Sequence, residues 1–158
     1  MIIKSIEVED VHFPRMNESE VNNFLESKLN LQLATIDAKG HPNIQPVWFD
    51  YEKESERFHI MTSKSSSKVK SIRNKPDIYF SIDDENFPYK GVKGKGTATL
   101  IDNRSRVVEM AKKICLKYLG TLEHPTAKML MEYAQNGKEI LVEINPKYFS
   151  AWDFSKGS

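Results

Sequence analysis

A cluster of hydroxyl and ammonium groups follows a short apolar run near the middle of the chain. After the run 58–62 come Ser63 and then Ser66, Ser67 and Lys68. The next residues have the composition of a short helix, whose first backbone N–H groups point outward and favour an anion. Serine hydroxyls and a lysine ammonium add hydrogen-bond donors and positive charge. The cluster could therefore bind a phosphate group, although its serines could also simply cap the helix.

A second stretch that could contribute to a binding site precedes this cluster. It consists of Gln45, Pro46, Val47 and Trp48. Proline has no N–H, so strand pairing is interrupted where it stands. Backbone groups beside it could then meet the polar edge of a heteroaromatic ring, with Val47 and Trp48 as a wall. An ordinary edge strand with Trp48 in the core is the alternative. Taken together, the two stretches favour a phosphorylated aromatic cofactor.

No other motif in the sequence supplies chemistry of its own. The single cysteine, Cys115, lies among apolar residues at helical spacing, and the four histidines are too scattered for a zinc site. The sequence has neither the Gly-x-Ser-x-Gly turn of a hydrolase nor the glycine-rich phosphate loop that ends in Gly-Lys-Ser/Thr. We therefore expect no metal and identify no catalytic residue. Any redox chemistry must come from a bound cofactor, because side chains do not transfer hydride.

Length and charge narrow the class of protein. The 158 residues suit one domain over 1–158 that can bury a core without disulfides. A formal net charge of +1 gives no general attraction to nucleic acid or to acidic membranes. A lone cysteine fits a reducing compartment, and we find neither a targeting segment nor an apolar run near ~18 residues. We expect a cytoplasmic protein without nucleic-acid or membrane partners.

About seven strands and several helices are expected to position the two stretches. Alternating apolar residues and turn residues predict strands, and apolar residues three and four apart predict helices. The expected strands are 31–36, 43–51, 57–62, 77–82, 91–101, 138–144 and 148–154. The expected helices are one that starts at Asn17 with an apolar face reaching Leu29, and the segments 69–74, 103–119 and 127–135. Three glycines in 91–101 indicate a bent strand, so an antiparallel barrel with inserted helices is the expected fold.

This order of motifs resembles the pyridoxamine 5′-phosphate oxidase-like proteins, which are FMN-binding split β-barrels. The resemblance extends from about residue 21 to 152, and its specificity lies in the order and spacing of landmarks that are individually degenerate. The landmarks are Leu33–Ile36, Gly40–Pro42, Pro46–Phe49, Met61–Thr62 with Ser66–Lys68, Asn74–Pro76 and Gly94–Ala98. The resemblance implies a mainly β split barrel of about 6–7 antiparallel strands with inserted helices.

The resemblance also implies a cofactor site shared between two copies of the chain. In this family the stretch that matches 45–48 lines the isoalloxazine ring of FMN, and the stretch that matches 61–68 holds its phosphate. A homodimer with the flavin at its interface would bring Lys90 and Trp152 from the second copy. The expected cofactor site therefore comprises Gln45, Pro46, Val47, Trp48, Met61, Thr62, Ser63, Ser66, Ser67, Lys68, Lys90 and Trp152.

Departures from the oxidase pattern argue against pyridoxamine phosphate as the substrate. Gln45 and Asp50 stand where the oxidase has an arginine and a lysine, and the C-terminus lacks its arginine and histidine. We expect an FMN-dependent oxidoreductase that transfers hydride to or from another small molecule. The alternatives are the deazaflavin F420 as cofactor, or a carrier or sensor that binds flavin, F420 or haem without turnover. A nucleic-acid-binding barrel is less favoured, because few aromatic residues interleave with its lysines, which are Lys64, Lys68, Lys90, Lys93 and Lys95.

Overall fold

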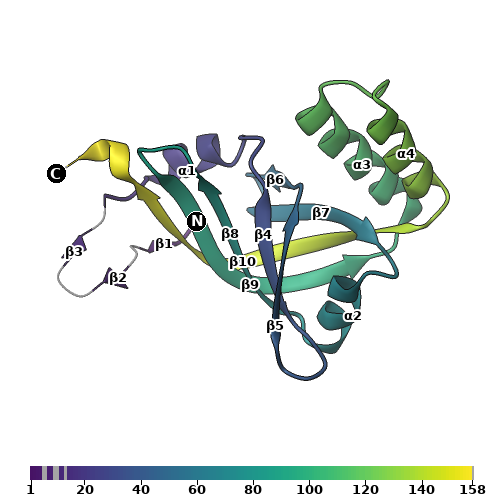
Figure 1. The fold of residues 1–158 in the computed structure, drawn as a ribbon, viewed down its shortest axis with the longest axis horizontal. Helices are drawn as coiled ribbons and strands as arrows, with labels where there is room; N and C mark the ends of the chain where they lie inside the picture. Colours follow the sequence, from purple (N-terminus) through teal and green to yellow (C-terminus); the bar gives the residue numbers. More distant parts are fainter. Residues whose placement is uncertain (5–6, 9–10, 13, 158) are drawn as a thin grey trace.

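One long, strongly curved and mainly antiparallel sheet organises the molecule (Figure 1). The computed structural model describes residues 1–4, 7–8, 11–12 and 14–157. The strands follow the order β5-β4-β8-β9-β10-β7-β6, and β1 (Ile3–Lys4) adds a short parallel pairing to β10. The strands on this path are β4 (Leu31–Ile36), β5 (Pro42–Val47), β6 (Asp50–Glu52), β7 (Arg57–Ser63), β8 (Asp77–Asp84), β9 (Lys90–Ile101) and β10 (Glu139–Asp153). A separate hairpin pairs β2 (Glu7–Val8) with β3 (Val11–His12).

Helices begin where the sequence provides caps. Asn17 forms a full capping box with Glu20, and Asn103 accepts a hydrogen bond from the backbone of Arg106. Gly120 ends a helix with φ of 73°, which costs a glycine little. The helices are α1 (Glu18–Phe24), α2 (Ser67–Asn74), α3 (Arg104–Leu119), α4 (Pro125–Gln135) and the 3₁₀ turn η1 (Phe154–Lys156). Figure 1 shows α3 and α4 side by side at one end of the sheet, with α2 near the β4–β5 hairpin.

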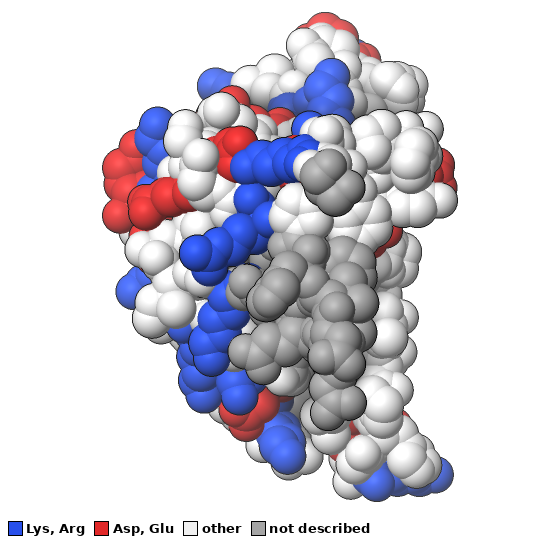
Figure 2. Space-filling model, turned by 90° about the vertical axis from the view of Figure 1, so that its left-hand side faces the viewer, with Lys and Arg blue, Asp and Glu red and all other residues white. Residues whose placement is uncertain are grey.

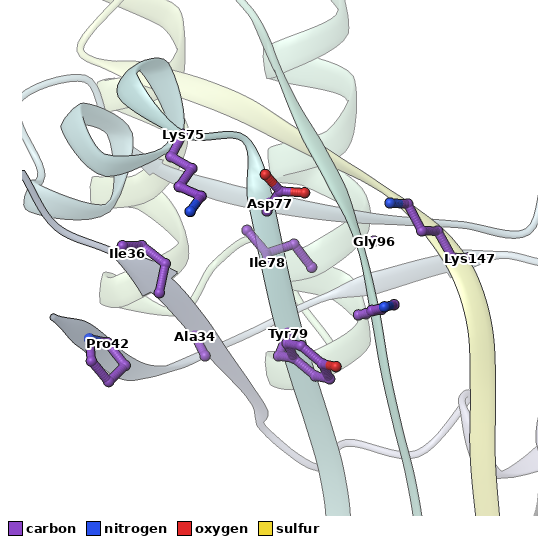
Figure 3. A pocket seen from close by; sticks show the side chains of 10 residues that line it. Ala34, Ile36, Pro42, Lys75, Asp77, Ile78, Tyr79, Gly96 and Lys147 are labelled. Atoms are coloured by element: carbon purple, nitrogen blue, oxygen red, sulfur yellow. The ribbon is translucent and has the colours of Figure 1, made fainter. Parts of the chain in front are cut away.

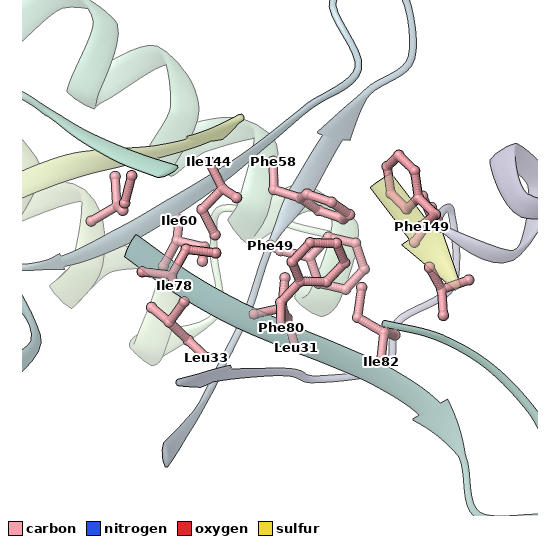
Figure 4. Close-up of a cluster of buried hydrophobic side chains, with 14 of the residues drawn as sticks. Leu31, Leu33, Phe49, Phe58, Ile60, Ile78, Phe80, Ile82, Ile144 and Phe149 are labelled. Carbon is pink, nitrogen blue, oxygen red and sulfur yellow. The ribbon is translucent and has the colours of Figure 1, made fainter. Parts of the chain in front are cut away.

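Two apolar clusters lie on opposite faces of β7. Phe58 and Ile60 point into the main core, where the aromatic rings of several strands meet (Figure 4). Met61, one residue further along, packs against the smaller cluster beneath α3 and α4. Successive side chains of a strand point to opposite faces of the sheet, so β7 is buried on both of its faces. One face of β7 points toward the barrel interior and the other toward the helices.

The structure confirms the expected fold class and corrects three of the expected elements. The strand expected over 43–51 is two strands, because Trp48 and Phe49 carry the chain from one edge of the sheet to the other. The first helix ends at Phe24 and does not extend its apolar face to Leu29. The two strands expected near the C-terminus are one strand, β10, which absorbs Pro146 by a register shift between Pro146 and Tyr148.

Candidate functional site

Two strand edges that have no strand partner among the described residues lie near the start of α2. β5 is the terminal strand of the sheet and pairs only with β4. On β7, residues 58 and 59 pair with both β6 and β10, Arg57 pairs only with β6, and 60–63 pair only with β10. Within the described part of the chain, one side of 42–47 and one side of 60–63 therefore face no strand. Backbone N–H and C=O groups on such edges are available to a ligand.

Polar side chains join these edges at the start of α2. Ser66 is the N-cap and accepts a hydrogen bond from the backbone of Val69 at 3.4 Å, so the capping role considered for the serines is present. The hydroxyl of Thr62, at the end of β7, donates to Ser66 Oγ at 3.3 Å. The amide of Gln45, on β5, donates to Ser67 Oγ at 3.4 Å. Gln45 of the second expected strand and Thr62 of the third thus lie at one helix N-terminus.

The first turn of α2 contains no acidic residue, so its N-terminal dipole is not compensated by a carboxylate on the helix itself. Ser63 lies beside the cap, where its hydroxyl pairs with Ser65 Oγ at 3.0 Å. Ser67 and Lys68 follow the cap directly, and neither serves as the capping side chain. The site therefore combines free helix N–H groups, hydroxyls and one ammonium, which is the donor set that a phosphate requires.

The ammonium of Lys68 lies in a low-dielectric environment near a buried carboxylate. Burial lowers the pKa of Lys68, and the charge of Glu139 partly opposes this effect. Burial likewise raises the pKa of Glu139, which is only 8% exposed, and Lys68 opposes that shift. An additional anion beside Lys68 would favour its charged form.

Other lysines that the sequence grouped together are separated in the structure. Lys64 turns away from the α2 N-terminus and pairs with Asp102 at 2.7 Å. Lys90 pairs with Asp153 at 3.3 Å at the other end of the sheet. Lys93 is exposed farther along β9. Figure 2 shows, on one side of the molecule, a column of basic side chains with acidic ones at both ends. The five lysines of the nucleic-acid hypothesis do not form one surface.

Trp48 is held by a residue that the sequence analysis did not identify. Its ring stacks on Tyr118 of α3 with centroids 4.7 Å apart and planes 5° apart. The Tyr118 hydroxyl donates to the carbonyl of Leu29 at 2.7 Å and accepts from the backbone N–H of Phe49 at 3.2 Å. These contacts fix the corner between β5 and β6 against α3. Trp48 is partly exposed and also packs against the smaller apolar cluster beneath α3.

Lys90 and Trp152 do not join the other predicted residues within one chain. They lie at the start of β9 and the end of β10, where Trp152 is paired with Gly91. Its ring fills the space of a Gly91 side chain, since an added Cβ would lie 2.0 Å from the indole. The α2 site adjoins the opposite end of β10, where Glu139 pairs with Ser63. Roughly 40 Å of strand separates the two ends, at about 3.3 Å per residue.

One surface pocket lies elsewhere, against the strands β4, β8 and β9 (Figure 3). It has a volume of about 390 Å³, and its lining includes Ala34, Tyr79, Lys75 and Lys147. None of the predicted cofactor residues lines it. A smaller depression of about 200 Å³ adjoins α2 and is lined by Ser67 and Lys70 among others.

Neither a metal site nor a membrane-spanning helix is found among the described residues. No group of three or more His, Cys, Asp or Glu side chains there could hold a metal ion. In the same part of the chain, every helix is too short or too polar to cross a membrane.

Most of the chain matches one known family by sequence. The model of the family described as pyridoxamine 5′-phosphate oxidase matches residues 18–153. No curated protein matches the chain at a significant level.

Several solved structures are similar to this chain in fold. A conserved hypothetical protein of Mycobacterium tuberculosis is 21% identical, with a TM-score of 0.79 over 94% of this chain and 92% of that chain. An F420 reductase is 22% identical, with a TM-score of 0.66 over 82% and 94% of the two chains. The haem storage protein HutZ of Vibrio cholerae is 17% identical, with a TM-score of 0.64 over 82% and 89%. At these identities the likeness shows the fold alone.

Proposed function

Since this chain belongs to the pyridoxamine 5′-phosphate oxidase family, we propose that it is an FMN-dependent oxidoreductase acting on a small molecule. The observation that carries the proposal is the N-terminus of α2. There Ser67 and Lys68 follow the cap, between two strand edges that have no strand partner in the described residues. Such an arrangement offers donors to a phosphate and backbone groups to a flat ring.

The residues present fit the two ends of FMN. Thr62, Ser66, Ser67 and Lys68 would hold the phosphate through hydroxyl, backbone and ammonium donors. The edges of β5 and β7 would hydrogen-bond the polar rim of the ring, with Met61 and Val47 beside it and Trp48 as a wall. When bound, the flavin supplies the hydride transfer that protein side chains cannot perform. The protein contributes binding, orientation and exclusion of water.

A second copy of the chain completes the proposed site. Lys90 and Trp152 lie too far along the sheet to reach the α2 site of their own chain, so they would act across a homodimer interface. Trp152 is held flat against Gly91 and is therefore already oriented. We propose a homodimer in which each flavin contacts both copies.

Pyridoxamine phosphate is not the proposed substrate. Asp50, which stands where the oxidase has a lysine, places its carboxylate 3.5 Å from the ammonium of Lys113. A carboxylate at that position adds negative charge where a second phosphate would need a cation. The proposed substrate is therefore a different small molecule.

The test is the colour and redox behaviour of the purified protein. We expect yellow protein that releases FMN on heating and whose visible absorbance bleaches anaerobically with NADH or NADPH. Light scattering of the coloured fraction should give about twice the chain mass of 18.2 kDa. Bleaching only with reduced F420, haem absorbance, or bound FMN that no donor reduces would contradict the proposed oxidoreductase. The last of these outcomes would favour a flavin carrier.

A pH profile gives a second measurement on the same site. Above about pH 7 the affinity for FMN should fall as the pH rises, because deprotonation of Lys68 or Glu139 makes the site less positive, by at most about tenfold per pH unit for each proton. Burial lowers the pKa of Lys68 and raises that of Glu139, so the ammonium is lost at lower pH than usual, and the carboxyl retains its proton to higher pH. The FMN phosphate is already a dianion above about pH 7 and adds no slope.

Fluorescence titrations at each pH would measure this profile, with riboflavin as the control because it lacks the phosphate. Riboflavin affinity should stay constant over the same range. An FMN affinity that rises with pH, or an equal slope for riboflavin, would remove Lys68 and Glu139 from the phosphate site.

A further inference from the structure

The pocket against β4, β8 and β9 has a lining that differs in chemistry from the proposed flavin site (Figure 3). Its volume of about 390 Å³ falls within the roughly 300–1,000 Å³ of small-molecule pockets. The lining combines apolar side chains with lysines and includes no residue of the predicted cofactor set. A ligand in this pocket would therefore be distinct from the flavin.

A short side chain in a row of larger ones produces the hollow. Ala34 of β4 lies directly opposite Ile44 of β5 and Tyr79 of β8. Directly opposed residues of neighbouring strands share one face of the sheet, so the methyl group of Ala34 lies between two much larger side chains. Two residues further along β4, Ile36 and its partner Pro42 add apolar surface to the lining. The hollow thus has an apolar surface of limited area.

The ring of Tyr79 is available to a ligand in this hollow. It belongs to the lining and is 52% exposed. Aromatic rings that stack or meet edge to face gain stability beyond the area that they bury. An exposed ring beside an apolar hollow therefore favours a flat aromatic ligand.

Lysines from three different elements surround the apolar surface. They are Lys75 at the end of α2, Lys95 on β9 and Lys147 on β10. Within the described parts of the chain, the ion pairs between lysines and carboxylates involve other lysines. Asp77 is the one carboxylate of the lining, so positive side chains outnumber negative ones three to one. The lining therefore favours an anion.

The helix end beside the pocket limits the charge of that anion. Lys75 is the C-cap of α2, where the helix dipole places partial negative charge, and Asp77 follows two residues later. Both features disfavour a compact dianion such as a phosphate monoester, which the N-terminus of the same helix would favour. A ligand with one negative charge, such as a carboxylate, suits this lining better.

We propose that this pocket binds a small aromatic carboxylate. The flat ring lies against Ala34 and Tyr79, and the surrounding ammonium groups attract the carboxylate. Lys95 contributes most, because it lies directly opposite Tyr79 and is the least exposed of the three lysines. The proposal does not depend on a bound flavin.

Titration of the purified protein with 2-naphthoate, followed by calorimetry and by amide NMR, tests the proposal. Binding should be saturable and should shift the amide signals of Ala34, Tyr79 and Lys95, with or without FMN. 2-Naphthamide keeps the rings but lacks the charge, so it should bind about three- to tenfold more weakly, the loss of one or two exposed ion pairs. Acetate should bind at least about tenfold more weakly, because it buries far less apolar surface.

Filling the hollow should abolish most of the binding. Ala34→Leu places a larger side chain in the hollow and should weaken 2-naphthoate binding at least about tenfold, because the ring then loses its apolar contact surface. Gln32→Leu is the matched control. Gln32 lies two residues away on the same face of β4, is partly exposed like Ala34 and does not line the pocket.

Removing one charge gives a second test that leaves the shape of the hollow intact. Lys95→Gln should weaken 2-naphthoate binding about two- to fivefold, as expected for one exposed ion pair. Lys93→Gln, two residues away on β9 and outside the lining, should bind 2-naphthoate like the original protein. This pair of variants remains informative if Ala34→Leu does not fold.

Three results would each overturn the proposal. They are the absence of saturable 2-naphthoate binding, equal binding of 2-naphthamide, and equal affinities of each variant and its control. Because the titration is done with and without FMN, failure of the flavin proposal would leave its outcome interpretable.

Discussion

Replacing Lys68 by alanine should weaken FMN binding by about 1.5–3 kcal/mol, or roughly 10- to 150-fold, the range for a hydrogen bond to a charged group. Lys68 is the first-turn cation of α2, in a partly desolvated position where a phosphate would not compete with bulk water for it. The change should leave the fold intact, because burial of the ammonium already costs free energy. Fluorescence titration of the apoprotein with FMN measures the effect.

Arg73→Ala is the matched control for this variant. Arg73 is an exposed cation in the last turn of the same helix, so its removal lowers the net charge equally but leaves the N-terminal donors in place. Its FMN affinity should stay within about twofold of the original, as expected for a screened surface charge. Equal losses in the two variants would mean that only overall charge matters, and no loss in Lys68→Ala would place the phosphate elsewhere.

Local sequence signals bear on the part of the candidate site that is made by contiguous residues. The caps, the serines and Lys68 lie within a few positions of one another, so local hydrogen bonding and the helix dipole dictate their arrangement. The position of 45–47 on an edge strand also follows from local signals, because Pro46 cannot donate to a ladder. The structure adds the contact between Gln45 and Ser67 that joins the two stretches.

The remaining features depend on residues far apart in the chain. The stack of Trp48 on Tyr118 joins positions 70 apart, and neither residue carries a local signal for the other. The same holds for His59 and Glu143, which are brought together only because β7 pairs with β10. A sequence pattern of period two predicts that His59 and Met61 share a face, but the partner strand and the covering helix decide what lies opposite. Local sequence patterns therefore do not predict which distant strands pair with each other.

Replacing Phe58 by alanine should destabilise the protein by about 3–5 kcal/mol, the cost of deleting a buried aromatic ring, against a total stability of about 5–15 kcal/mol for a domain of this kind. Phe58 is fully buried and contacts the rings of Phe49, Phe80 and Phe149 (Figure 4). It also contacts the ring of Tyr51. Because those rings come from three other strands and from the connection between β5 and β6, one cavity would loosen several walls of the barrel. Urea unfolding followed by circular dichroism measures the change in free energy.

Phe87→Ala deletes the same ring at a position that is 79% exposed, and its free energy of unfolding should change by less than about 0.5 kcal/mol. If Phe58→Ala does not fold, Phe58→Leu retains most of the volume and should cost less than about 1.5 kcal/mol. Phe58 faces the core, whereas the proposed cofactor site is formed by strand edges and by side chains at the start of α2. Folded Phe58→Leu should therefore bind FMN with unchanged affinity, which separates the residues that hold the barrel together from those that hold the cofactor. Equal destabilisation by Phe58→Ala and Phe87→Ala would mean that Phe58 does not lie in the core of the barrel.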